Sequence, residues 1–176
     1  MTDQELRDLV AENARAIRES DKNLKKLAGE VGWFGNSLGR FTESLFTPSL
    51  DRILVNDFGL DTVAHRVRRK HDDAIMEIDV LGYSNSEKNT AVVVEIKSRL
   101  RDEDIKNFLT RLKKFPKIYT EHKGKKILGM MAAVTLSVEQ RAKLEKNGIY
   151  VVLISDEVFR IVSDKKFRPH DFGMKE

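Results

Sequence analysis

The chain has 176 residues, of which 40% are hydrophobic, 34% are charged and none is cysteine. This length predicts one domain with a stable core, and the absence of cysteine excludes disulfides and thiolate metal sites, as expected for a cytoplasmic protein. No apolar run approaches the roughly 18 residues of a membrane-spanning helix, and the net charge of +4 is too mild to identify a partner by itself.

Residues 1–31 are predicted to form a long polar helix with a narrow apolar stripe. Val10, Ile17, Leu24 and Val31 recur at heptad spacing, as in a short coiled coil. Two interpretations stay open: the helix folds back on its own domain, or it pairs with a second copy to form a homodimer. The two glycines of Gly32–Asn36 predict a hinge after this helix.

A second helix is predicted from Asn36 to Asp57, and a strand from Thr62 to Lys70. Glu43 lies off the apolar stripe of that helix, where it would be an ordinary solvated residue if it had no further role. The strand carries Arg68 and Arg69 among several other basic residues. This composition fits a solvated edge strand, and it fits a contact with nucleic-acid phosphates equally well.

Two strands joined by a polar turn are predicted next, from Ala74 to Leu81 and from Ala91 to Lys97. Strand side chains alternate between the two faces of a sheet. One face of the first strand is therefore expected to hold the side chains of Ala74, Met76, Ile78 and Val80. The corresponding apolar face of the second strand is expected to hold Val92, Val94 and Ile96.

The opposite face of this hairpin is expected to gather charged groups. Facing residues of an antiparallel pair project to the same side, so a register with Asp79 opposite Glu95 also sets Glu77 opposite Lys97. Ionised groups among core residues are costly unless they are paired or bind a metal ion.

Asp79, followed across a hairpin by Glu95-Ile96-Lys97, resembles the PD-(D/E)xK nuclease superfamily, which has the restriction endonuclease-like fold. The resemblance covers residues Phe34 to Leu153. The family places an acidic residue at one strand end and (D/E)-x-K on the next strand, and it usually adds a Glu on the preceding helix, for which Glu43 is the candidate. The proline that often precedes the aspartate is absent, because Ile78 stands there.

The resemblance implies a metal-dependent phosphodiesterase. Asp79 and Glu95 would bind Mg²⁺ or Mn²⁺, with the backbone carbonyl of Ile96 as a further ligand. Lys97 would orient the attacking water or stabilise the transition state. Glu43 would tune the metal or bind a second one, and Glu77 would be either an extra ligand or, as we prefer, the ion-pair partner of Lys97.

The segment after this hairpin is basic. Residues 99–126 hold ten Lys and Arg against four Asp and Glu, and a helix is predicted to begin at Asp102. The positive charge is either an ordinary solvated helix face or a surface for a phosphate backbone. The expected nucleic-acid contacts are Arg68, Arg69, Lys113, Lys114 and Lys117.

The remaining chain completes an α/β pattern. Two buried strands, 127–135 and 149–154, flank a helix over 136–147, which favours a parallel pair; residues 158–162 are expected to add an edge strand. The predicted organisation is a helix over 1–31, a nuclease-like domain over 34–162 with a mixed sheet flanked by helices, and a tail over 163–176.

Three functions are compatible with these patterns. The first is a metal-dependent nuclease that acts on DNA. The second is a catalytically silent protein of the same fold that binds nucleic acid or a partner. The third is a coiled-coil interaction protein whose acidic face is only structural. Metal affinity separates the first from the third, and cleavage at comparable DNA affinity separates the first from the second.

Overall fold

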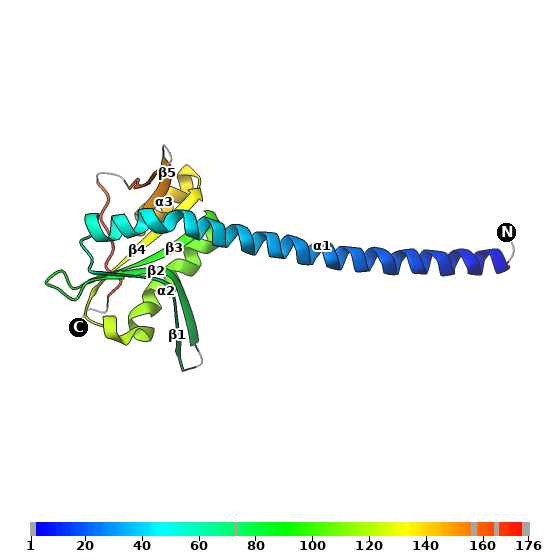
Figure 1. The fold of residues 1–176 in the computed structure, drawn as a ribbon, viewed down its shortest axis with the longest axis horizontal. Coiled ribbons are helices and arrows are strands. Elements are labelled where there is room, and N and C mark those ends of the chain that lie inside the picture. The colour runs from blue at the N-terminus through cyan, green and yellow to red at the C-terminus, as the bar shows by residue number, and fades with distance from the viewer. Residues whose placement is uncertain (1–2, 73, 156–157, 164–165, 174–176) are drawn as a thin grey trace. The chain divides into compact units, whose positions relative to one another are not determined.

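The computed structural model describes residues 3–72, 74–155, 158–163 and 166–173 (Figure 1). Within these ranges it leaves out the side chains of 3–11, 14–16, 34, 36, 38–45, 74, 154–155 and 158–159. The chain divides into two units, Met1–Arg40 and Phe41–Glu176. None of the helices in the described residues is long and apolar enough to cross a membrane.

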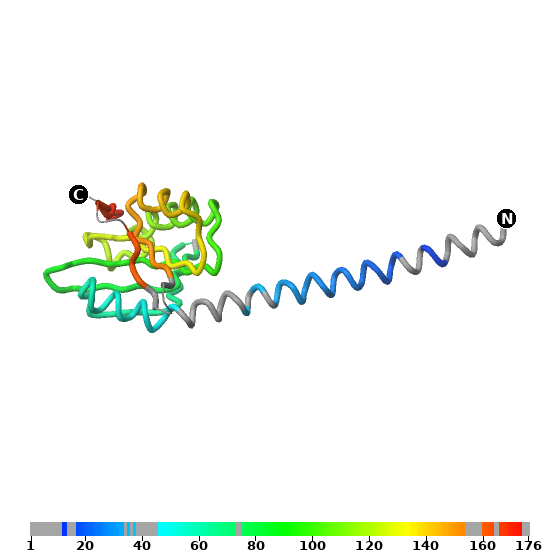
Figure 2. Tube along the Cα trace, turned by 90° about the horizontal axis from the view of Figure 1, so that it is seen from above, coloured from blue at the N-terminus to red at the C-terminus, as the bar shows by residue number. Residues whose placement is uncertain are grey.

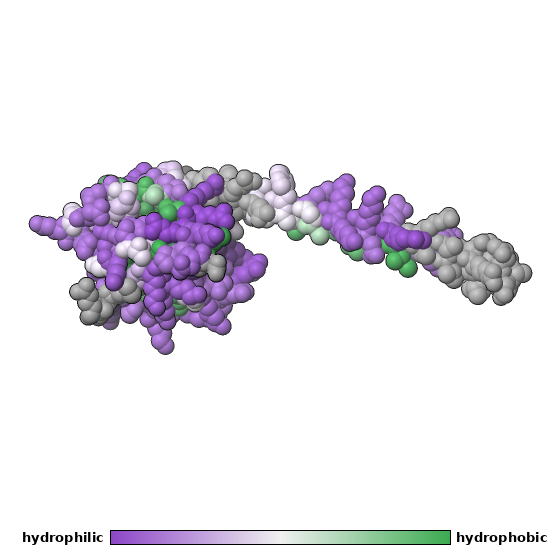
Figure 3. Space-filling view, turned by 90° about the horizontal axis from the view of Figure 1, so that it is seen from below, coloured by the Kyte–Doolittle hydropathy of each residue, from purple (hydrophilic) through white to green (hydrophobic). Residues whose placement is uncertain are grey.

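The first unit consists of helix. α1 (Asp3–Arg52) is one helix of 50 residues, and it continues through Gly32–Asn36, so the predicted hinge was wrong. A glycine costs only about 1 kcal/mol inside a helix, which the neighbouring turns can offset. Ile17, Leu24 and Val31 are each more than 60% exposed, and Figure 3 shows apolar patches along the otherwise hydrophilic helix.

The second unit contains a six-stranded mixed sheet with strand order β1-β2-β3-β4-β5-β6. Its strands are β1 (Thr62–His71), β2 (Ala74–Tyr83), β3 (Thr90–Arg99), β4 (Lys126–Thr135), β5 (Tyr150–Ser155) and β6 (Val158–Ile161). The pairs β1–β2, β2–β3 and β5–β6 are antiparallel, whereas β3–β4 and β4–β5 are parallel. The predicted α/β mixed sheet flanked by helices is confirmed.

Helices cover both faces of this sheet (Figure 2). The last turns of α1 and the following π-helix Ile53–Asp57 bury Phe46, Leu50 and Leu54 on one face. On the other face lie α2 (Asp102–Ile118) and α3 (Val138–Lys146). A short 3-10 helix, Thr120–His122, follows α2.

α2 forms because its sequence supplies a buried stripe and a capped start. Its apolar side chains at helical spacing, Ile105, Phe108, Leu112 and Phe115, are all buried. At its start, the Asp104 carboxylate accepts a hydrogen bond of 2.8 Å from the Arg101 N–H. The helix approaches the sheet closely over Gly129, where an added Cβ would lie 2.6 Å from Leu112 Cδ1. From this helix Arg111 reaches Glu95 on the neighbouring strand β3.

The alternation predicted for β3 is confirmed, but the one predicted for β2 was wrong. Val92, Val94 and Ile96 share one core. In β2, however, Met76 and Ile78 belong to the same core as Leu81, while Val80 belongs to the opposite one. The strand turns over at Asp79. Beside it on β1, Arg66 has a φ of +52° and is missing from an otherwise regular register, so a local kink interrupts the two-residue period.

Candidate active site

The candidate site lies where β2 and β3 separate. Their paired register runs from Tyr83↔Ala91 to Val80↔Val94 and then stops. Beyond this point the Asp79 carboxylate continues the link, because its Oδ2 accepts a hydrogen bond of 2.7 Å from the Ile96 N–H. We call Asp79, Glu95, Ile96 and Lys97 the fork.

Glu95 is the most buried charged group of the fork, with a side chain only 5% exposed. Its Oε1 lies 2.7 Å from Lys97 Nζ, and its Oε2 contacts the Arg111 guanidinium of α2. Both cations are about one-third exposed. A buried carboxylate is tolerated when such partners compensate its lost hydration, so Glu95 is held in place by one cation from β3 and one from α2.

Lys97 has a raised pKa, which keeps its side chain protonated. Burial disfavours the ammonium, but the carboxylates of Glu95, Asp79 and Asp104 outweigh this effect and raise the pKa of Lys97. Lys97 is therefore a protonated ammonium across the neutral pH range, and it lies within electrostatic reach of the carboxylates on both β2 and β3. It can orient or stabilise an anion, but it cannot serve as a general base at neutral pH.

Two residues of the fork, Glu95 and Lys97, line a surface pocket of about 460 Å³. The rest of its lining comes from polar residues of α2, namely Asp104, Asn107, Thr110 and Arg111. Arg111 NH1 also donates a hydrogen bond of 3.3 Å to the Glu77 carbonyl, and its Cζ lies 5.9 Å from the centre of the Phe108 ring. Arg111 thus ties α2 to both strands of the fork.

The other predicted acidic residues are placed differently. The Glu77 side chain does not contact Lys97; it lies 3.1 Å from Arg68 on β1, because the β2 alternation changes at Asp79. The side chain of Glu43 lies outside the described residues. Among the described residues, no three His, Cys, Asp or Glu side chains are placed to hold a metal ion together.

The donor set still suits a hard divalent cation in its chemistry. Asp79 and Glu95 supply carboxylate oxygens and Ile96 supplies a main-chain carbonyl, and such oxygens are the ligands that Mg²⁺ prefers. A metal ion that binds Glu95 would have to compete with Lys97 and Arg111 for its oxygens.

The predicted nucleic-acid contacts fall into two groups. Arg68 and Arg69 of β1 pair with the carboxylates of Glu77 and Glu121, and Arg69 also lies over the Tyr119 ring. The exposed face of α2 carries the other three, Lys113, Lys114 and Lys117. The α2 lysines are therefore the better candidates for an external anion.

Sequence reasoning missed the role of Arg111. In the sequence, Arg111 is notable only because it precedes Leu112 of the apolar α2 stripe, so it lies on the flank of the helix. That it reaches Glu95 depends on how closely α2 approaches β3, which no local pattern reveals.

No family model matches the chain, and no curated protein matches it. Distant likenesses to solved structures exist. The protein VC1899 from Vibrio cholerae is 17% identical over 63% of this chain and 29% of its own, with a TM-score of 0.46. The structure of the EndoMS–dsDNA2 complex is 18% identical over 60% of this chain and 42% of its own, with a TM-score of 0.39. A repair endonuclease from Pyrococcus abyssi is 17% identical over 62% of this chain and 46% of its own, with a TM-score of 0.40. The matched region spans less than half of each of these proteins, and the likenesses are too distant to assign a family.

Proposed function

We propose that this chain is a metal-dependent nuclease-like protein with a restriction endonuclease-like core, and that it hydrolyses phosphodiester bonds in DNA. The observation that carries the proposal is the fork, where Glu95 contacts the ammonium of Lys97 and the Asp79 carboxylate accepts a hydrogen bond from the intervening Ile96 N–H. Carboxylates for a divalent cation and a fixed positive charge for a phosphate are the two groups that this hydrolysis needs.

Each residue of the fork has a distinct role in this proposal. Asp79, Glu95 and the Ile96 carbonyl would hold Mg²⁺ or Mn²⁺, which would polarise the phosphate and lower the pKa of a bound water. Lys97 would orient that water or stabilise the charge that develops on the phosphate. Glu43 remains a candidate for an additional ligand, whereas the Glu77–Arg68 pair argues against a metal role for Glu77.

The second candidate is a catalytically silent protein of the same fold that binds nucleic acid. The observation that favours it is the occupation of both Glu95 oxygens by Lys97 and Arg111. If this clamp is permanent, a metal ion cannot use Glu95, and the fork is a buried ion network.

Incubation of the purified protein with linear, circular, single-stranded and branched DNA tests the proposal, with Mg²⁺, Mn²⁺ or EDTA present. We expect cleavage that requires metal and that Asp79→Asn and Glu95→Gln abolish without loss of DNA binding. Both amides keep the side-chain volume, and Asp79→Asn also keeps an oxygen that can accept from the Ile96 N–H. Binding without cleavage under every metal condition would support the silent candidate instead.

We also propose that the protein forms a homodimer through α1. The stripe of Ile17, Leu24 and Val31 is exposed, and an isolated helix with so narrow a stripe gains little stability without a packing partner. A second copy presents the same heptad spacing, so it is the natural occupant. Two active sites in one dimer would also suit the two strands of a duplex.

A further inference from the structure

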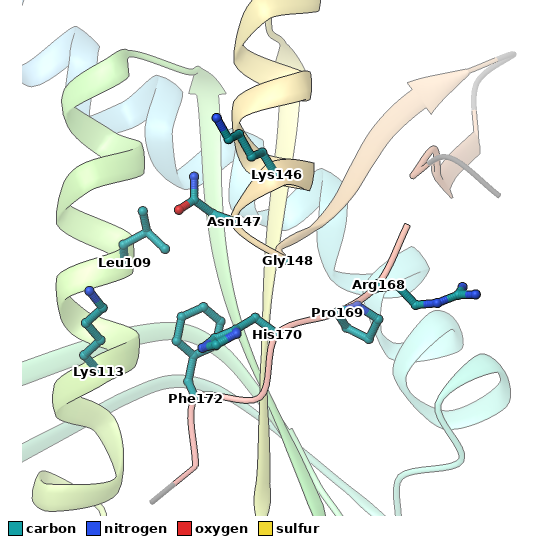
Figure 4. A pocket seen from close by; sticks show the side chains of 9 residues that line it. All are labelled: Leu109, Lys113, Lys146, Asn147, Gly148, Arg168, Pro169, His170 and Phe172. Carbon is teal, nitrogen blue, oxygen red and sulfur yellow. The ribbon is translucent and has the colours of Figure 1, made fainter. Parts of the chain in front are cut away.

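The C-terminal segment builds a second pocket, on the flank of α2 that faces α3 (Figure 4). Its volume is about 460 Å³, and its lining comes from α2, from the end of α3 and from residues 168–172. The lining carries Lys113, Lys146, Arg168 and His170 but no acidic residue. Figure 4 shows Lys113 on the α2 wall, Lys146 on the α3 wall with its ammonium directed away from His170, and His170 beside Phe172, with Arg168 directed outwards past Pro169.

The wall formed by residues 168–172 is fixed by main-chain contacts. The His170 N–H donates a hydrogen bond of 3.0 Å to the Gly148 carbonyl, and the Phe172 N–H donates one of 2.8 Å to the Ile127 carbonyl. Gly148 permits this approach, because it has a φ of +69° and an added Cβ would lie 2.3 Å from His170 N. The Asp171 Oδ1 accepts hydrogen bonds of 2.9 Å from the N–H groups of Ile127 and Gly173. The pocket is therefore a preformed part of the second unit.

The positive charges of this pocket are not compensated by neighbours. In the part of the chain that the structure describes, none of its three Lys and Arg side chains contacts a carboxylate. Other surface cations do find one: Lys143 pairs with Asp102, and Arg141 with Glu145. Uncompensated cations around one pocket favour an anionic ligand.

The geometry points to a phosphate-binding pocket, and we propose that Lys113, Lys146 and His170 hold a backbone phosphate of the nucleic acid whose scissile bond lies at the fork. This inference rests on the proposed function. The two sites lie on opposite flanks of α2, since the fork pocket is lined by Asn107, Thr110 and Arg111, and this one by Leu109 and Lys113.

Further positive side chains lie on α2 between the two pockets. Its exposed face carries Lys106, Lys114 and Lys117. A helix is about 10 Å across, and a duplex strand advances about 3.4 Å per nucleotide. A strand that crosses α2 would therefore bring phosphates to both pockets about three nucleotides apart, which a mononucleotide could not do.

The test measures DNA binding in EDTA, so that it is independent of cleavage. The salt dependence of affinity is measured by anisotropy with a fluorescein-labelled blunt duplex between about 50 and about 200 mM salt. Each phosphate contact contributes about 0.9 to the slope of log K against log salt. Because Lys113 and Lys146 hold one phosphate together, Lys113→Gln combined with Lys146→Gln should lower the slope by about 0.9. Lys22→Gln combined with Lys25→Gln, on exposed positions of α1, should leave the slope unchanged.

A second arm uses inorganic phosphate and the NMR signals of the His170 ring. In the unaltered chain these signals should move as phosphate is added, and in the Lys113 and Lys146 double variant the movement should be lost. If the salt dependence of DNA affinity is unchanged in that variant, the proposal is overturned, whatever the cleavage assay gives. If inorganic phosphate nevertheless moves the His170 signals of the unaltered chain, the pocket binds a free anion and not a DNA phosphate. If the double variant lowers the salt dependence of binding but the unaltered protein shows no metal-dependent cleavage, only the catalytic proposal is refuted.

Discussion

Arg111 should compete with a divalent cation for Glu95. Its guanidinium contacts Glu95 Oε2, so a metal ion that takes this oxygen must displace a charge-assisted hydrogen bond. Such bonds contribute about 1.5–3 kcal/mol. Because the Arg111 side chain is 33% exposed, solvent weakens the interaction and the lower end, about 1.5 kcal/mol, is appropriate. Since about 1.4 kcal/mol corresponds to a factor of ten, Arg111→Met should bind Mn²⁺ or Mg²⁺ about tenfold more tightly.

Isothermal titration of Mn²⁺ into the unaltered and variant proteins measures this difference. Methionine keeps an unbranched apolar stem against Phe108 and removes every donor, so packing changes little. Lys114→Gln is the matched control, because it removes one positive charge from the exposed face of the same helix. Equal metal affinity in the unaltered and Arg111→Met proteins would refute the competition, and binding that survives Glu95→Gln would place the metal elsewhere.

Three further predictions concern stability and assembly. Glu95→Ala should lower the free energy of unfolding by about 1–2 kcal/mol in urea titrations, because it leaves the cations of Lys97 and Arg111 without their shared partner. Burial, with help from Lys125 and Arg69, lowers the pKa of His122 below its usual value, so the native state resists protonation. The stability that this contributes should be complete above about pH 6.5 and should fall as the pH drops below it. Deletion of residues 2–30 should convert a dimer into a monomer by light scattering.

Each of these predictions has a result that contradicts it. Unchanged stability of Glu95→Ala would mean that the ion cluster contributes nothing to folding. For the pH effect, His122→Phe keeps a ring between Phe115 and Tyr83 and should flatten the acid limb of the stability curve; an identical limb would assign it to other groups. Monomers of both the full and the shortened chain at high concentration would exclude pairing through α1.

The fold was largely predictable because its strands and helices carry strong local signals. The buried strands β4 and β5 are continuous apolar runs, and their parallel pairing follows from the helix between them. The α2 stripe of Ile105, Phe108, Leu112 and Phe115 is equally plain. The continuous α1 was not predicted, because glycine weakens a helix locally without stopping one that long neighbouring turns support.

The candidate site was predictable only in part. Asp79, Glu95 and Lys97 were chosen from strand spacing and the E-x-K pattern, and in the structure Lys97 contacts Glu95 while Asp79 accepts a hydrogen bond from the Ile96 N–H. The kink at Arg66 has no sequence signal, so the direction of Glu77 was misjudged. Arg111 and the pocket at Lys146 depend on the approach of segments far apart in the sequence, which local periodicity does not encode.

The hydrogen bond from the Ile96 N–H to Asp79 has a consequence for spectroscopy. At this point a side chain replaces the main-chain acceptor that a regular ladder would provide. Protection of this one amide against hydrogen exchange therefore reports the position of the Asp79 carboxylate. Any ligand that draws the carboxylate away should make the Ile96 amide exchange faster, while the amides within the paired Val80–Val94 segment of the hairpin stay protected. The exchange rate of the Ile96 amide can therefore report whether a ligand occupies the fork, without a cleavage assay and without a label on the ligand.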